Sequence, residues 1–157
     1  MRRFLIFFAL SSLLLTFAAA PEAQAQRHPG SLGIGVGSAT LASGLSLKPV
    51  AGPSALQITL GCRGSSCSGV AGAVDVLAPM PNLATTAPFN LAWNVGIGGA
   101  LGIGDGLDAA AAFVLGLEFI FQPIPVDLVV EWRPSINVVP DVGFSPVSFG
   151  AHLRFYL

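Results

Sequence analysis

The sequence predicts an all-β protein, an eight-stranded antiparallel transmembrane β-barrel with a filled polar lumen. Apolar and polar residues alternate with a period of two in segment after segment, as in strands whose two faces meet different surroundings. The chain is 53% hydrophobic but only 10% charged, against about 25% charged in an ordinary soluble domain. Its last stretch, 149–157, is such an alternating strand, and a barrel can pair that strand with its first one.

The N-terminus has the features of a secretory signal peptide. Arg2 and Arg3 precede an apolar run over 4–20, and Ala23-Gln-Ala25 supplies a small-x-small cleavage site. We therefore expect residues 1–25 to be a cleaved signal peptide for the Sec route, and residues 26–157 to form one outer-membrane β-barrel domain. An uncleaved anchor is the alternative, but the apolar run is short for a spanning helix.

Eight strands are expected in the mature chain, each from its own alternation of apolar and polar residues. Turn residues separate them: a loop closed by two cysteines follows the third strand, a Pro-rich stretch lies at 78–88, and further loops lie at 104–108 and 139–146. The predicted strands cover 32–37, 44–48, 56–61, 70–76, 90–98, 113–121, 126–133 and 149–157.

The charged residues of these strands fall on one face. An Arg or Lys on the lipid face costs about 2–4 kcal/mol at mid-membrane, so we expect the charged face to line the lumen. Near-balanced charge favours a plug of ion pairs over a water-filled channel, with Glu118, Glu131 and Arg154 at its centre. The predicted lumen ion-pair network is Lys48, Asp75, Glu118, Asp127, Glu131, Arg133, His152 and Arg154.

The opposite face of the strands is apolar and is expected to contact lipid. Its predicted lipid-facing aromatics are Trp93, Phe113, Phe119, Phe121, Trp132, Phe149 and Phe155. The inverse arrangement is a soluble lipocalin-like barrel with its apolar face around a ligand. Too few charges would then remain for the outer surface, and too many aromatic rings would compete for a small interior.

Cys62 and Cys67 are five residues apart, and after export they would meet an oxidising compartment. We expect a loop disulfide, with free thiols as the alternative. No metal site is expected, because two cysteines cannot form a structural zinc site and His28 and His152 lack ligand spacing to them.

No cofactor, nucleic acid or catalytic site is predicted. The glycine-rich stretches at 33–37 and 96–99 miss the dinucleotide-binding spacing, and no Walker lysine is present. A net charge of −1 lacks the basic face that nucleic acids require. A carboxylate paired with His152 could in principle perform acid–base chemistry. We favour an internal salt-bridge network, because no serine is placed in the chain so as to form a recognisable triad with this histidine.

With these residues in view, the chain resembles a family of small bacterial outer-membrane β-barrel proteins, comparable in size to OmpX and the OmpA barrel. Leu153, Phe155 and Leu157 resemble the terminal strand by which the barrel-assembly machinery recognises its clients, although Leu157 stands where such signals usually end in Phe. The other similar stretches are Leu32-Gly-Ile-Gly-Val36, Gly44-Leu-Ser-Leu-Lys48, Asn94-Val-Gly-Ile-Gly-Gly99, Leu115-Gly-Leu-Glu-Phe119, Val130-Glu-Trp-Arg-Pro134 and Val139-Pro-Asp141.

The resemblance implies eight antiparallel strands, a filled lumen and an N-terminus in the periplasm, in a family whose members largely lack an assigned activity. We therefore expect a monomeric protein of the bacterial outer membrane that contacts membrane lipid and has a structural or surface-interaction role without catalysis. Its outer loops are candidates for binding an extracellular partner. A narrow transporter of small or apolar solutes, a soluble lipocalin-like periplasmic ligand binder and a lipid-modifying enzyme are the alternatives.

Overall fold

The computed structural model describes residues 30–51 and 54–157, and this part of the chain is built of strands. The predicted signal peptide at 1–25 lies outside the described residues. In the part of the chain that the structure describes, no helix has the length and apolar character needed to cross a membrane.

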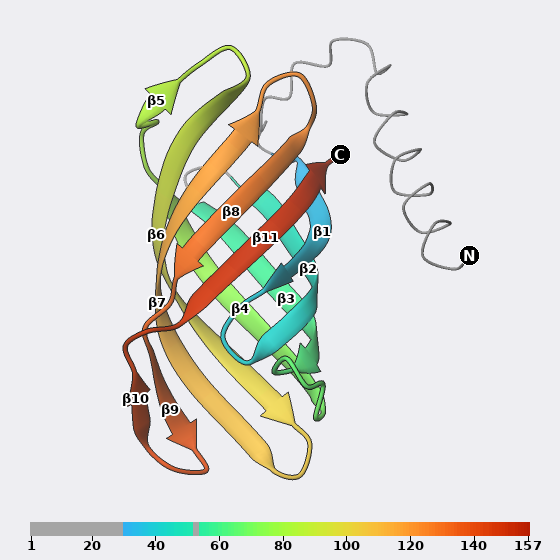
Figure 1. The fold of residues 1–157 in the computed structure, drawn as a ribbon, viewed down its shortest axis with the longest axis vertical. Helices are drawn as coiled ribbons and strands as arrows, with labels where there is room; N and C mark the ends of the chain where they lie inside the picture. Colours follow the sequence, from blue (N-terminus) through green and yellow to red (C-terminus); the bar gives the residue numbers. More distant parts are fainter. Residues whose placement is uncertain (1–29, 52–53) are drawn as a thin grey trace, which may run out of the picture.

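Eight of the strands close into an antiparallel barrel in the order β1-β2-β3-β4-β6-β7-β8-β11, and β11 pairs back with β1 (Figure 1). The predicted eight-stranded antiparallel barrel is confirmed. The barrel strands are β1 (Leu32–Ser38), β2 (Ala42–Ala51), β3 (Ser54–Arg63), β4 (Val70–Pro79), β6 (Phe89–Ile103), β7 (Leu107–Phe121), β8 (Val126–Trp132) and β11 (Phe149–Tyr156). Three short strands lie outside the ring: β5 (Ala84–Thr85), β9 (Ser135–Val139) and β10 (Gly143–Ser145).

The barrel has two different ends (Figure 1). One end, which we call the terminus end, holds β5, the β7–β8 turn and the C-terminus. The opposite end, which we call the loop end, holds the β1–β2 turn, the β3–β4 loop, the β6–β7 turn and the β9–β10 hairpin. Successive antiparallel strands therefore place all the connections that follow β1, β3, β6 and β8 at the loop end.

The wall is taller on one side. β6 and β7 have 15 residues each and pair from Phe89–Phe121 to Ile103–Leu107. β8 pairs with Leu115–Ile120 in the second half of β7, and β9 takes its place beside Ala109–Ala112 in the first half. β10 pairs with β9 and stands at the edge of the sheet. We call residues 99–111 together with the β9–β10 hairpin the extension.

Charged and polar side chains point inward together with some apolar ones, and most of the large apolar side chains point outward. On β7, Val114 and Glu118 are 0% and 2% exposed, whereas their neighbours Leu115 and Leu117 are 37% and 44% exposed. The same alternation runs along β4, β8 and β11. This is the reverse of a lipocalin-like barrel, whose apolar face would surround the interior.

The inner face changes character along the barrel axis. Towards the loop end it is lined by small apolar residues, and Ala42, Ala71, Ala73 and Ala100 form a buried cluster against which Leu41 packs. Towards the middle and the terminus end it carries the charged residues. A second small cluster there joins Ala55, Leu77 and Val114.

Two loop predictions were wrong in their extent. The predicted loop at 104–108 shrinks to three residues, because β7 begins at Leu107 and includes four consecutive alanines. The predicted last loop at 139–146 contains β10, which forms a hairpin with β9. The Pro-rich stretch at 78–88 holds the two-residue strand β5, paired with Asn90 and Leu91 of β6.

Candidate functional site

The candidate site is the hydrogen-bonded interior of the barrel. All eight side chains predicted for the lumen network lie inside it, and each residue is at most 3% exposed. They come from five barrel strands, with Arg133 directly after β8. The alternation of each strand carries them inward, since period-two spacing puts every second side chain on the same face.

Arg133 lies at the centre of the network. Its guanidinium donates to both carboxylate oxygens of Asp75, over 3.1 Å to Oδ2 and 2.7 Å to Oδ1. The same group donates to Oε2 of Glu131 over 2.6 Å, and its Nε donates to the Thr40 hydroxyl over 3.2 Å. Because Arg presents a rigid fork of donors, one cation here pairs with two buried carboxylates from β4 and β8, strands that β6 and β7 separate in the wall.

Gln57, which was absent from the predicted network, connects its parts. The amide nitrogen of Gln57 lies 3.1 Å from Oδ2 of Asp75 and 3.0 Å from Oε1 of Glu131. Its amide oxygen accepts a hydrogen bond of 2.6 Å from Nη1 of Arg154. The predicted centre of Glu118, Glu131 and Arg154 is thus only partly right, because Gln57 stands between Glu131 and Arg154.

Two further ion pairs lie towards the terminus end. Arg154 donates through Nε and Nη2 to the two oxygens of Asp127, at 3.1 Å each, and the Tyr156 hydroxyl donates to Oδ2 of Asp127 over 2.8 Å. Lys48 forms an ion pair with Glu118. Asn94 donates to Oε1 of the same glutamate over 2.9 Å, so Glu118 bonds to partners from β2 and β6.

The interior is close to charge balance. Three cations, Lys48, Arg133 and Arg154, share it with four carboxylates, and His152 is the remaining ionisable group of the predicted set. With His152 neutral this set carries one net negative charge, and with His152 protonated it carries none. Removing one member of a buried ion pair typically costs about 3–5 kcal/mol, so the network fixes how the strands face one another.

The prediction that no serine accompanies His152 was wrong. Oγ of Ser46 lies 2.9 Å from Nδ1 of His152, and Nε2 of His152 lies 3.3 Å from Oε2 of Glu131. If Nε2 carries the proton, the serine hydroxyl donates to Nδ1 and the ring donates to the carboxylate, which is the order of groups in a nucleophile–base–acid relay.

Burial prevents this relay from acting as a hydrolase site in the observed conformation. Ser46 and Glu131 are 0% exposed and His152 is 1% exposed, so no substrate carbonyl can reach the serine hydroxyl. A nucleophile needs its target within about 3–3.5 Å. In this structure the three side chains are therefore members of the buried network and are closed off from the solvent.

Glycines of β1 explain why Ser46 and His152 meet. β1 lies between β2 and β11, and its inner positions are Gly33, Gly35 and Gly37. A Cβ at Gly37 would overlap Nδ1 of His152. With no side chains on the inner face of β1, those of β11 lie across it and reach β2. The sequence signal for Ser46 was its inner-face position beside Lys48, but nothing local indicated a partner 106 residues away.

On the outer face, the predicted aromatics are exposed or half-buried. Phe149 is 66% exposed, and Phe113 and Trp132 are 42% and 41% exposed. Trp93, Phe119, Phe121 and Phe155 are half-buried on the same face. β11 lies between β8 and β1, and the predicted assembly-signal residues are at its C-terminal end: Leu153, Phe155 and Leu157. Leu153 pairs with Leu128 of β8 and Val36 of β1.

At the loop end, Cys62 and Cys67 are joined by a disulfide, which confirms that prediction. Arg63, beside this bridge, forms an ion pair with Asp108 of β7 and thereby connects the β3–β4 loop to the extension. Among the described residues, no group of three or more His, Cys, Asp or Glu side chains is arranged to hold a metal ion.

The fold and site define a class of protein, a closed eight-stranded barrel with an ion-paired interior and an apolar exterior. Comparisons with protein-family models, curated proteins and solved structures found no match to this chain. The resemblance to small outer-membrane barrels stated above therefore stays a prediction.

Proposed function

We propose that the chain is an integral outer-membrane β-barrel protein with a structural or surface-interaction role and no catalysis. The observation that carries the proposal is the reversed polarity of the barrel, with ionised side chains inside and large apolar side chains outside. Val36, Ile97 and Leu153 are 63%, 69% and 49% exposed on the outer face. A water-facing surface of this kind would invite association, whereas a closed barrel in lipid requires it.

Strand length supports the same proposal. β2, β3 and β4 have 10 residues each, and about 9–11 tilted residues cross a bilayer. With the terminus end in the periplasm, as the resemblance implies, the loop end faces outward. This topology places the disulfide loop and the β9–β10 hairpin on the cell surface.

The surface-interaction role would reside in the extension. Phe144 and Val147 are 67% and 75% exposed beside the β10 edge, and Val142 is 83% exposed at the hairpin tip. An edge strand offers unpaired backbone groups to which an extended segment of a partner can add. The hairpin is therefore the part of the molecule that we assign to an extracellular protein partner.

A gel comparison tests the membrane barrel. The mature protein, refolded in detergent, should migrate differently in SDS gels with and without boiling, because a closed barrel of this class resists the detergent until it is heated. Identical migration of the two samples, with a protein that stays folded in detergent-free buffer, would overturn the proposal.

Epitope insertion tests the location and the topology together. A short epitope between Asp141 and Val142 should be labelled by antibody on intact bacteria. A matched epitope between Ala84 and Thr85, at the opposite end of the barrel, should be labelled only after the outer membrane is permeabilised. Labelling in the reverse pattern, or of neither epitope, would contradict the proposed topology.

The lumen does not support the transporter alternative, because its charged side chains fill the interior and are at most 3% exposed. Planar bilayers containing the refolded protein should show no defined conductance steps. Steady single-channel openings that persist after removal of contaminating porins would restore transport as the function.

A further inference from the structure

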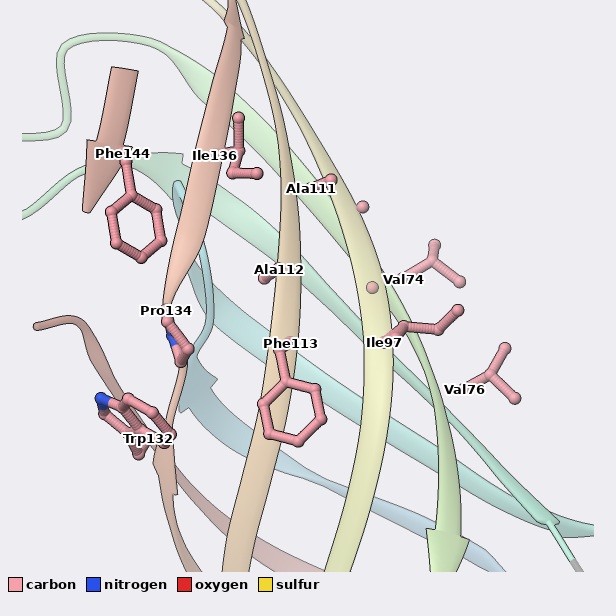
Figure 2. A pocket seen from close by; sticks show the side chains of 12 residues that line it. Val74, Val76, Ile97, Ala111, Ala112, Phe113, Trp132, Pro134, Ile136 and Phe144 are labelled. Atoms are coloured by element: carbon pink, nitrogen blue, oxygen red, sulfur yellow. The ribbon is translucent and has the colours of Figure 1, made fainter. Parts of the chain in front are cut away.

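An apolar groove of about 750 Å³ runs over the outer face of the wall (Figure 2). One side of it is formed by β4 and β6, and the other by the segment from β8 to β10. It is lined by Val74, Val76, Ile97, Gly98, Gly99, Ala111, Ala112, Phe113, Trp132, Pro134, Ile136 and Phe144. Every one of these side chains is apolar, apart from the indole nitrogen of Trp132.

The floor of the groove is set by small residues on two paired strands. Gly99 of β6 lies opposite Ala111 of β7, and both face outward. A Cβ at Gly99 would meet no atom nearer than 3.9 Å, so the space above this position is open. Two residues away along the strands, Ile97 and Phe113 restore large outward side chains and bound the floor.

The far side of the groove is held in place by the β9–β10 hairpin. Trp132 donates through its indole nitrogen to the carbonyl of Pro146 over 2.9 Å. Its ring meets that of Phe113 edge-on, at a centroid distance of 6.5 Å. Figure 2 shows Ile136 and Phe144 continuing this side on β9 and β10. The aromatic side is therefore fixed by contacts within the molecule.

The groove continues in both directions along the wall. Towards the loop end, a hollow of about 550 Å³ shares Val74, Gly99 and Ala111 with it and extends to Val138. In the other direction, a hollow of about 240 Å³ shares Val76, Ile97 and Phe113. Together the three hollows form one long and almost wholly apolar groove on the outer surface.

The apolar lining of this groove and the lack of free backbone groups around it favour a hydrocarbon chain over a peptide as its occupant. The strands beneath and beside it, β4, β6, β7 and β9, are already paired in the sheet, so they offer no free ladder to an extended peptide. A peptide in the groove would leave its own N–H and C=O groups unpaired, which is costly in an apolar site. A hydrocarbon chain has no such groups and leaves no polar group unpaired there.

We propose that this groove holds one acyl chain of a lipid from the outer leaflet of the membrane. The inference rests on the proposed function, since it needs the outer face in lipid and the loop end outside. The groove is continuous with the apolar outer face and lies on the loop-end half of the wall. The β9–β10 hairpin then has two roles: β10 provides the free edge strand, and Ile136 and Phe144 contact the lipid chain.

The two tryptophans of the chain allow a direct test. Trp132 lines the groove, whereas Trp93 lies on the outer face outside it. Single-tryptophan proteins, Trp93→Phe and Trp132→Phe, are refolded in detergent and titrated with phosphatidylcholine brominated on its acyl chains. Trp132 fluorescence should be quenched at low lipid-to-protein ratios and reach a plateau, while Trp93 fluorescence should fall gradually with the lipid content of the micelle.

Filling the groove provides the matched control. Gly99→Leu or Ala111→Leu, each in the protein that retains Trp132, should abolish the saturable phase. Ala151→Leu, at an outward position of β11 away from the groove, should leave it intact. Heat-dependent gel migration identifies which variants have folded, and either groove variant alone suffices for the comparison.

The outcomes separate the two proposals. Equal, non-saturating quenching of both tryptophans would show general lipid contact and overturn the groove, while leaving the membrane barrel standing. A saturable phase that survives Gly99→Leu and Ala111→Leu would also overturn it. No quenching of either tryptophan would mean that the outer face does not contact lipid, and the proposed function would fail first.

Discussion

The middle of the barrel and the extension both alternate inward and outward residues, but their inward residues differ: they are charged in the middle and small and apolar in the extension. In the closed middle, the inner face carries Asp75, Glu131 and Arg133, and every carboxylate has bonded partners. In the extension the inner face carries Gly102 and Ala110, and the nearest ion pair, Arg63–Asp108, is partly exposed. Charge is concentrated where eight strands surround it completely, and small apolar residues suffice where the wall has fewer neighbours.

The largest expected effect comes from breaking the middle. Arg133→Met would leave two buried carboxylates without their shared cation and should lower the free energy of unfolding by about 3–5 kcal/mol. Urea unfolding of the refolded protein in detergent, followed by tryptophan fluorescence, measures this loss. The matched change at the ion pair that joins β3 to the extension, Arg63→Met, removes a partly exposed pair and should cost about 0–1 kcal/mol. Similar losses in the two variants would refute the contrast.

The next effect concerns the connection between the ion pairs. Gln57→Leu keeps most of the side-chain volume but removes the bonds to Glu131, Asp75 and Arg154. Each buried polar group left unpaired costs about 1–3 kcal/mol. In the same urea assay, Gln57→Leu should lower the free energy of unfolding by at least this amount. Gln57→Glu, which keeps the side-chain size but adds a negative charge, serves as the comparison. An unchanged midpoint for Gln57→Leu would show that the ion pairs are independent of one another.

A third test makes the same glycine-to-alanine substitution at two positions, one on the inner face and one on the outer face. Gly37→Ala inserts a methyl group against the His152 ring and should destabilise the barrel by about 1–3 kcal/mol, the usual cost of overpacking. Gly99→Ala adds a methyl group to open space in the outer groove and should stay within about 0.5 kcal/mol of the parent, as surface changes usually do. Equal effects would remove the distinction between the inner glycines of β1 and the outer glycine of the extension.

The smallest effect is expected at the serine of the buried relay. Ser46→Ala removes one hydrogen bond to His152 and should cost about 1 kcal/mol, without altering the membrane lipids of the cells that express it. Mass spectrometry of extracted lipids from cells with the parent protein and with the Ser46→Ala and His152→Ala variants checks this. A lipid species that disappears in both variants would establish catalysis in place of the structural role.

Strand alternation was sufficient to predict the closed ring but not the extension. Residues 109–112 are four alanines, which have no alternation to read and low strand propensity, so the start of β7 was missed. The β9–β10 hairpin was read as a loop because Pro140, Gly143 and Pro146 resemble turn residues. Its strands form because β9 finds a partner in the long wall of β7, which is a tertiary effect.

The candidate site was predictable in membership but not in pairing. Charged residues on the inner face could be assigned from the sequence, because each assignment needs only the phase of one strand. Gln57 and Ser46 could be placed on the same face, but their partners lie on strands far away in the chain. Choosing those partners requires the register of β11 against β1 and of β1 against β2, which the sequence does not reveal.

The bare inner face of β1 also bears on the order in which the barrel can be assembled. β11 comes after every other barrel strand in the chain, and it alone brings Arg154 and His152 inside. Before it docks, the inner face holds four carboxylates and two cations, Lys48 and Arg133. Without β11, the inner face of the sheet therefore carries a net negative charge. β11 adds Arg154 and His152 and, by pairing with β8 and β1, closes the wall. The same strand therefore completes the barrel and lowers the net negative charge of its interior.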